Sequence, residues 1–333
     1  MVAMNNNREI VDLLMNQEKI EIVNDAFRDW TLLDNIKIGS NITYIGLNAF
    51  NGCTSLTSIE FPLSVTYIRT GAFRDCTSLT TVVIPSSVTL IESCAFGYCT
   101  SLKSVKILGQ IQSIGSHTFS GCTSLSSIEI PDSLVSIGDV AFYECAALSS
   151  IKIPDSVASF GYNVFYGCNA LTEIELPSSA LAVGEGSFCN CLSLKTVKIP
   201  PSVTVIGTNA FSECSSLENI NIPPSVLIIR GSAFRGCTSL KSIEIPSSVT
   251  HVGDCLFENC TSLTDIKFLA SVDKIGVCTF MNCQSLETIE IPASVTFFGY
   301  NSFYICKSLK CIVVHSNIKK MYYFNMTFFR KIP

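Results

Sequence analysis

A strict period of 23 residues constrains this sequence more than any other feature. One unit reads Cys53-Thr-Ser-Leu56-Thr-Ser-Ile59-Glu-Phe-Pro62, and the same chemistry returns without insertion over most of the chain. A fixed period of this size is typical of a solenoid, in which each repeat buries its apolar face only against its neighbours. The phenylalanine row comprises Phe27, Phe50, Phe73, Phe96, Phe119, Phe142, Phe165, Phe188, Phe211, Phe234, Phe257, Phe280 and Phe303, and the cysteine row comprises Cys53, Cys76, Cys99, Cys122, Cys145, Cys168, Cys191, Cys214, Cys237, Cys260, Cys283 and Cys306.

Length and charge limit the number of domains and the kinds of partner that the chain can have. A chain of 333 residues would ordinarily divide into two or three domains, but a solenoid needs no second core. Charged residues make up 15% of the chain and the net charge is −5, which argues against a nucleic-acid partner because such a partner requires a basic face. No apolar run reaches the roughly 20 residues that span a bilayer. The first residues also lack the cationic start and apolar core of a secretory signal, which favours a cytoplasmic location.

Each repeat predicts a strand, a corner and a turn. Alternating apolar residues such as Ile59 and Phe61 suit a short strand with one buried face, and the proline that follows ends the strand. A glycine row, of which Gly138 is one member, indicates a positive φ or a tight corner. Phe73 and Cys76 are three residues apart, which predicts one helical turn with both side chains on the same side.

The repeat resembles the BspA-type leucine-rich repeat. The stretch Gly138-Asp-Val-Ala-Phe-Tyr-Glu-Cys-Ala-Ala-Leu-Ser-Ser-Ile-Lys-Ile-Pro154 carries every fixed position of that signature, and the resemblance covers about residues 20–326. It implies a right-handed, curved leucine-rich repeat solenoid with one parallel β-sheet on the concave face and short helical turns on the convex face. It also implies a surface or secreted protein with a role in adhesion, so the resemblance favours the cell surface where the N-terminal sequence favours the cytoplasm.

The ends of the chain depart from the regular pattern. Residues 1–26 are expected to form a helical cap and a degenerate half-repeat, with apolar residues such as Ile10 and Leu14 covering the first rung. Residues 27–314 form the array of 23-residue units. Residues 315–333 are expected to form a degenerate repeat and a C-terminal cap.

The cysteines are interpreted as structural thiols. Twelve of the 17 belong to one row of the repeat, and buried thiols behave as small hydrophobes. Cys255 and Cys278 share a different position on consecutive repeats and could form a disulfide on oxidation, so their redox state stays open. Cys94 and His117 also share a position, but structural zinc takes four ligands and only two are present here. We therefore expect no metal.

The sequence predicts no enzyme. The three histidines, His117, His251 and His315, fall at different positions of the repeat, and no nucleophile elbow, phosphate-binding loop or zinc-protease motif is present. A nucleophile needs an adjacent base and an orienting group, and repeated serines and cysteines do not supply them. We expect no catalytic residue and no cofactor.

One outward row of the strands alternates in charge. From Lys106 to Lys198 the sign changes at every repeat. In-register strands place these side chains next to one another, so opposite charges are expected to pair laterally. The alternative is that the row forms a site for a charged ligand.

Aromatic residues on the turns are the best candidates for partner contact, because binding hot spots favour tyrosine, tryptophan and arginine. They could equally cover only the turn beneath them. We interpret the protein as a non-enzymatic scaffold for protein–protein interaction, related to the cell surface or to adhesion, with an intracellular scaffold without external ligand as the alternative. The sequence identifies neither the protein ligand nor the oligomeric state. The candidate residues are Tyr143, Tyr162 and Tyr166 in one group, and Phe297, Tyr300 and Tyr304 in the other.

Overall fold

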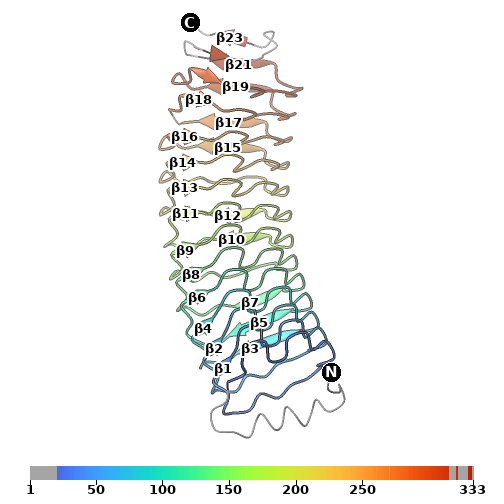
Figure 1. The fold of residues 1–333 in the computed structure, drawn as a ribbon. Helices are drawn as coiled ribbons and strands as arrows, with labels where there is room; N and C mark the ends of the chain where they lie inside the picture. The colour runs from blue at the N-terminus through green and yellow to red at the C-terminus, as the bar shows by residue number, and fades with distance from the viewer. Residues whose placement is uncertain (1–20, 270, 315–319, 322–328, 332–333) are drawn as a thin grey trace. The chain divides into compact units, whose positions relative to one another are not determined.

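The computed structural model describes residues 21–269, 271–314, 320–321 and 329–331. The chain divides into an N-terminal unit, residues 1–157, and a C-terminal unit, residues 158–333. Each unit is a parallel β-solenoid in which successive rungs stack along the chain, so the predicted solenoid fold is confirmed (Figure 1).

Each unit contains two rows of short parallel strands. The first row contains the strands that the sequence predicts, and the second follows the proline corner. In the N-terminal unit the first row comprises β3 (Thr81–Ile84), β5 (Ser104–Ile107) and β7 (Ser127–Glu129), and the second comprises β1 (Tyr44–Ile45), β2 (Tyr67–Ile68), β4 (Leu90–Ile91), β6 (Ser113–Ile114) and β8 (Ser136–Ile137). The second row was not anticipated from the sequence.

The C-terminal unit repeats this arrangement. Its first row comprises β10 (Glu173–Glu175), β12 (Thr196–Lys198), β15 (Ser242–Ile245), β17 (Asp265–Phe268), β19 (Thr288–Ile291), β21 (Cys311–Val314) and β23 (Phe329–Lys331). Its second row comprises β9 (Ser159–Phe160), β11 (Ala182–Val183), β13 (Val205–Ile206), β14 (Ile228–Ile229), β16 (His251–Val252), β18 (Lys274–Ile275), β20 (Phe297–Phe298) and β22 (Lys320–Met321).

The strand register follows the sequence period. Equivalent residues of consecutive repeats pair directly, as Val82 does with Val105 in the first row. A proline follows directly after three of the four-residue strands, namely β3, which ends before Pro85, β15, which ends before Pro246, and β19, which ends before Pro292. The pairing of β23 does not follow this period. Phe329 lies opposite Ile312, and these two residues are fewer than 23 positions apart in the sequence.

The core is a set of continuous side-chain rows. Rings of the phenylalanine row stack in parallel, with Phe50 and Phe73 centroids 5.1 Å apart in one unit and Phe211 and Phe234 centroids 5.7 Å apart in the other. Leucines of the repeat, such as Leu102, are fully buried beside them. Offset stacking of aromatic rings adds to the stabilisation that comes from burying their area.

The predicted helical turn is wrong. Within the described residues no helix is present, and the segment between the second strand row and the leucine is a series of tight turns. In residues 71–76, alternate amides bond within the rung and across it: Arg74 N–H donates to the carbonyl of Gly71, whereas Phe73 N–H donates to the carbonyl of Ala95 on the next rung, 2.8 Å away. A helix would direct all of these amides along its own axis. In this turn segment half of the amides donate to carbonyl groups of the next rung. They form a third row of hydrogen bonds between rungs, beside the two rows of strands.

Positive φ angles explain why a helix cannot form. In each rung two residues of the turn segment lie in the left-handed region, as Gly71 (φ 64°) and Asp75 (φ 58°) do. A right-handed helix cannot run through such residues. The spacing of three between Phe73 and Cys76 is therefore produced by two consecutive turns.

The glycine row is explained by close approach rather than by a positive φ. Gly138 is not among the residues with positive φ. A Cβ atom at this position would lie 2.6 Å from the main-chain nitrogen of Ser116 on the preceding rung. The tight corner was therefore predicted correctly and the φ angle was not.

The predicted terminal caps remain predictions. The helix expected around Ile10 and Leu14 lies outside the described residues, as does most of the segment 315–333. At the N-terminal side the described chain begins at residue 21, and Ile22 bridges to Ile45 in the parallel register of the repeat.

Candidate interaction surfaces

The outward face of the first strand row is covered by paired charges. Lysine and glutamate on consecutive rungs form ion pairs, with N–O distances of 2.8 Å for Lys106–Glu129, 3.0 Å for Lys198–Glu175 and 3.2 Å for Lys267–Glu244. A neighbouring row adds Lys241–Glu218 at 2.6 Å and Lys310–Glu287 at 2.8 Å. Lateral pairing is confirmed for the three pairs of the predicted row, whereas the pairs of the neighbouring row were not predicted from the sequence. Charges satisfied in this way leave little free charge for a ligand, and each exposed pair contributes about 0.2–1 kcal/mol.

The first predicted tyrosine group spans the two units. Tyr143 lies in the N-terminal unit and is half-buried, whereas Tyr162 and Tyr166 lie in the C-terminal unit. Tyr162 is half exposed, at 50%, and Tyr166 is half-buried. Within the C-terminal unit these two tyrosines belong to the same turn segment.

The second predicted group lies within one unit and on neighbouring elements. Phe297 is half-buried on β20, and Tyr300 and Tyr304 on the following turn segment are 52% and 56% exposed. Val277 and Ile305 are also exposed. The carbonyl of Tyr300 accepts from the amide of Cys278 on the preceding rung, which fixes the turn that presents these side chains. We name Val277, Phe297, Tyr300, Tyr304 and Ile305 the C-terminal aromatic patch.

A polar corner on β1, β2 and β4 was missed by the sequence reasoning. Arg69 Nε lies 2.7 Å from Glu92 Oε1, and Arg69 Nη1 donates to the hydroxyl of Tyr44 at 2.6 Å. The hydroxyl and the amide of Thr70 both donate to Glu92 Oε2. Tyr67, 44% exposed, lies beside Tyr44 in the pairing of β1 and β2. The signal was present, because Arg69 and Glu92 interrupt the glycine row one period apart.

The charges of this corner support each other. Partial burial acts to raise the pKa of Glu92, but hydrogen bonds from Thr70 and Arg69 and the positive charge of Arg69 outweigh it, so the pKa lies below its ordinary value. The Arg69 guanidinium also lies 5.5 Å from the centre of the Tyr44 ring, within the range of a cation–π contact. On the adjacent turn segment, Arg74 lies 5.4 Å from the centre of the Tyr98 ring.

The cysteine row is buried and chemically quiet. Burial raises the pKa of the thiols of Cys53, Cys122 and Cys191 to about 12, so the reactive thiolate is scarce near neutral pH. All 17 cysteines are free.

Two pairs outside the cysteine row, Cys255 with Cys278 and Cys94 with His117, have no third metal-binding side chain grouped with them in the part of the chain that the structure describes. Cys255 and Cys278 are half-buried, and burial, followed by the charge of Glu258, raises the pKa of Cys255 to about 11. Cys94 and His117 are also half-buried, on consecutive rungs. In residues 21–269, 271–314 and the short described segments beyond, no group of three or more histidine, cysteine or acidic side chains is placed to hold a metal ion.

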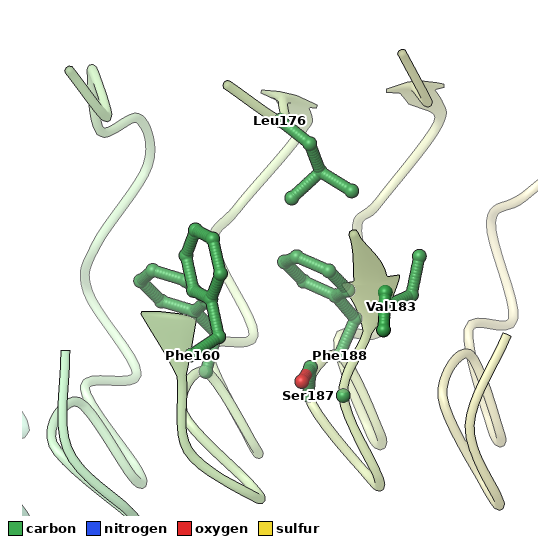
Figure 2. Close-up of a pocket in the computed structure, with 8 residues that line it drawn as sticks. Phe160, Leu176, Val183, Ser187 and Phe188 are labelled. Atoms are coloured by element: carbon green, nitrogen blue, oxygen red, sulfur yellow. The ribbon is translucent and has the colours of Figure 1, made fainter. Parts of the chain in front are cut away.

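One small pocket lies inside the C-terminal unit. Figure 2 shows Phe160, Leu176, Val183, Ser187 and Phe188 around it. Its volume of about 10 Å³ is that of one water molecule. Val183 stands where the next rungs have isoleucine, as at Ile206, and the smaller side chain leaves the space. The pocket is too small for an organic substrate.

Comparisons with known proteins agree with the fold. A family model described as the BspA type leucine rich repeat region, in six copies, matches residues 20–133, 89–218 and 205–330. A crystal structure of a leucine-rich repeat protein from Bacteroides ovatus is similar at 31% identity, with a TM-score of 0.84, over 93% of this chain and 80% of that one. A leucine rich cell surface protein from Faecalibacterium prausnitzii aligns at 27% identity, with a TM-score of 0.46, over 79% of this chain and 82% of that one. Comparison with curated proteins gives no match.

Among the described residues no helix has the length and apolar character needed to cross a bilayer.

Proposed function

Because this chain belongs to the BspA-type leucine-rich repeat family, we propose that it is a non-enzymatic scaffold that binds another protein. Repeat solenoids offer extended surfaces on which many small contacts can add together. The proposed contact surface is the C-terminal aromatic patch. The paired lysines and glutamates on the outward face of the first strand row, which we name the charge ladder, are already engaged in lateral ion pairs.

One observation carries this proposal: Tyr300 and Tyr304 expose more than half of their side chains, whereas the phenylalanine row beside them is buried. Tyrosine is enriched in binding hot spots because it combines a large apolar ring with a hydrogen-bonding hydroxyl. Val277 and Ile305 enlarge the apolar area around the two rings. Such a patch suits a protein surface that offers apolar pockets for the rings.

A site-specific crosslinking experiment tests the surface. A photo-reactive amino acid in place of Tyr304 should capture a partner of discrete mass, and the same residue in place of Lys198, on the charge ladder, should not. The double variant Tyr300→Ala, Tyr304→Ala should lose the partner in a pull-down. Equal capture from both positions, or capture that survives the double variant, would contradict this assignment.

The tyrosines of the first group are further proposed contact residues, with Tyr143 in the N-terminal unit and Tyr162 and Tyr166 in the C-terminal unit. The triple variant Tyr143→Ala, Tyr162→Ala, Tyr166→Ala compared with the intact array tests it in the same pull-down. Binding that depends on this triple variant and not on Tyr300 and Tyr304 would move the contact surface to these turns.

We further propose a location at the cell surface and a role in adhesion, supported by the family resemblance. The alternative is an intracellular scaffold without external ligand. Protease treatment of intact cells separates the two, because a surface protein is cleaved and an intracellular one is protected until the cells are lysed. Full protection in intact cells would reject the adhesion role.

A further inference from the structure

An exposed apolar area lies on the second strand row of the C-terminal unit. It lies along β11, β13 and β14, which are neighbours in this order (Figure 1). Leu181 and Leu227 come directly before β11 and β14, at the repeat position that Thr204 occupies before β13. Leu181 is 65% exposed and Leu227 is 47% exposed, Ala182 is exposed, and Val205 and Ile228 are half-buried. We name these five residues the β11–β14 patch.

The patch is confined to three rungs. On the next rungs the equivalent positions hold polar residues, namely Thr250 and His251, then Asp273 and Lys274. The alternate residues of the same strands, Val183 and Ile229 among them, fill the core. The outward apolar residues are therefore not needed for packing within the rung. A local cluster of exposed aliphatic side chains is a common mark of an interface.

Two opposite charges flank the patch at its two ends. Glu185 follows β11 and Arg230 follows β14, and both side chains are exposed. Between them, the equivalent positions after β13 are Gly207 and Thr208, which are uncharged. Neither Glu185 nor Arg230 forms an ion pair within the part of the chain that the structure describes. The rung of β11 thus carries the carboxylate of Glu185, and the rung of β14 carries the guanidinium of Arg230, each without an ion-pair partner among the described residues.

We propose that this patch binds the same patch of a second copy of the chain. A two-fold axis parallel to β13 keeps the strand direction and reverses the order of the rungs. It places β11 of one copy over β14 of the other, so Leu181 meets Leu227 and Glu185 meets Arg230, twice each. Val205 lies on the axis and meets its own equivalent. An isologous interface requires this kind of self-complementarity.

The charge arrangement favours a second copy over an unrelated partner. Glu185 comes two residues after β11 and Arg230 directly after β14, and these strands lie one rung on either side of β13. Reversal of rung order therefore brings opposite charges together, whereas the unreversed arrangement would bring like charges together. Electrostatic complementarity of this type fixes orientation more than it raises affinity. The dimer is accordingly a weak one, since five residues make only the centre of an interface of standard size.

Sedimentation velocity of the full chain tests the proposal. The protein should shift from monomer to dimer over roughly 1–100 μM, the range of weak specific complexes. Leu181→Glu and Leu227→Glu should each raise the dissociation constant at least tenfold. Val135→Glu is the matched control, because Val135 is 43% exposed at the position equivalent to Leu181 in the N-terminal unit. It should leave the dimer unchanged.

A charge exchange identifies the orientation. Glu185→Arg alone and Arg230→Glu alone should each be monomeric, because each variant places like charges opposite one another. An equimolar mixture of the two should form a heterodimer, in which every facing pair is again opposite in sign. A wild-type protein that stays monomeric over this range, a dimer that survives both leucine variants, or a mixture that stays monomeric would each overturn the proposal.

Discussion

The thiol of Cys76 donates a hydrogen bond to the main-chain carbonyl oxygen of Phe50, 3.2 Å away on the preceding rung. The same contact recurs along the row, as for Cys99 with Phe73 at 3.1 Å and Cys214 with Phe188 at 3.1 Å. The cysteines are therefore more than small hydrophobes. They pack in the core and also satisfy carbonyl groups that face into it.

Replacement of Cys99 by valine tests this role. Valine keeps the side chain apolar and similar in volume but removes the donor, so we expect a loss of about 1 kcal/mol in the free energy of unfolding. Urea denaturation measures it. Cys311→Val, at a half-buried cysteine outside the row, should change the stability by less than about 0.5 kcal/mol. An equal effect of both variants would mean that the hydrogen bond contributes nothing.

Alkaline pH should destabilise the fold through the same row. Burial raises the pKa of the thiols of Cys53 and Cys122 to about 12, whereas a thiol in the unfolded chain titrates near about 8.5. A raised folded pKa gives stability that is complete below the unfolded pKa and is lost as the pH rises toward the folded pKa. Each such thiol lowers the unfolding free energy by up to about 1.4 kcal/mol per pH unit in this window.

Chemical denaturation at several pH values checks this expectation. Between roughly pH 7 and 8 the row should have little effect, and between roughly pH 9 and 12 the stability should fall steeply. The Cys99→Val variant should show a shallower fall than the wild type. Parallel curves for the two proteins would contradict the prediction.

The phenylalanine row should carry a large share of the stability. Phe165 is fully buried and its ring centre lies 5.6 Å from that of Phe188. Phe165→Ala should cost about 3–5 kcal/mol, because it removes buried area and leaves a cavity in the stack. Tyr304→Ala, at an exposed ring, should cost less than about 0.5 kcal/mol in the same denaturation experiment. A cost under 1 kcal/mol for Phe165→Ala would be incompatible with a tightly packed row.

The sequence predicted the solenoid because its period repeats without insertion. It also predicted the lateral ion pairs. In parallel in-register strands the neighbours of an outward side chain are the equivalent side chains of the adjacent repeats, so the charges in one row of the repeat decide the pairing. It did not predict the second strand row, in which each strand is only two residues long, as in Tyr67–Ile68. Such a strand is too short for alternation to be visible, and only its stacking on equivalent strands makes it regular.

The wrong helical turn has a similar cause. A spacing of three between Phe73 and Cys76 fits a helix and also fits two consecutive turns. The distinction depends on φ at positions where the residue type varies, from Asp75 to Tyr98 and Glu144, all with positive φ. Carbonyl groups of the neighbouring rung accept hydrogen bonds from the amides of these residues and so fix their backbone conformation. The carbonyl of Gly97 accepts in this way from the amide of Asp75. A single repeat read alone does not contain that information.

The candidate contact residues were only partly accessible to sequence reasoning. Tyr300 and Tyr304 were selected as turn aromatics, and both are exposed. Leu181 and Leu227 were not selected, because an aliphatic residue next to a strand is expected in the core. In the structure Ala180 and Val183, on either side of Leu181 in the chain, fill the core, and Leu181 therefore stays exposed.

Ser187 tests how much stability an unpaired hydroxyl group costs in the core. Its hydroxyl is buried beside the small pocket, and among the described residues none offers it a hydrogen-bond partner. Ser187→Ala should therefore raise the unfolding free energy by about 1 kcal/mol, since an unpaired buried hydroxyl is costly. Ser302, at the equivalent position, donates to the carbonyl of Gly299 at 2.8 Å, so Ser302→Ala should not stabilise. If both variants behaved alike, a bound water would have to satisfy the hydroxyl of Ser187.

The polar corner at Arg69 should make stability depend on acid pH through Glu92. The pKa of this carboxyl is below its ordinary value of 4.5, so the stability it gives is present above that value and is lost as the pH falls through the lowered folded pKa. Glu92→Gln removes the charge that faces Arg69 but keeps an acceptor for Thr70, and should cost about 1 kcal/mol at neutral pH. As the pH falls through this lowered pKa the carboxylate of the wild type protonates, so the difference between the two proteins should shrink. Thermal denaturation across this pH range measures both, with Glu60→Gln, an exposed glutamate, as the control. A difference that stays constant from neutral to acid pH would mean that the charge of Glu92 contributes nothing to the fold.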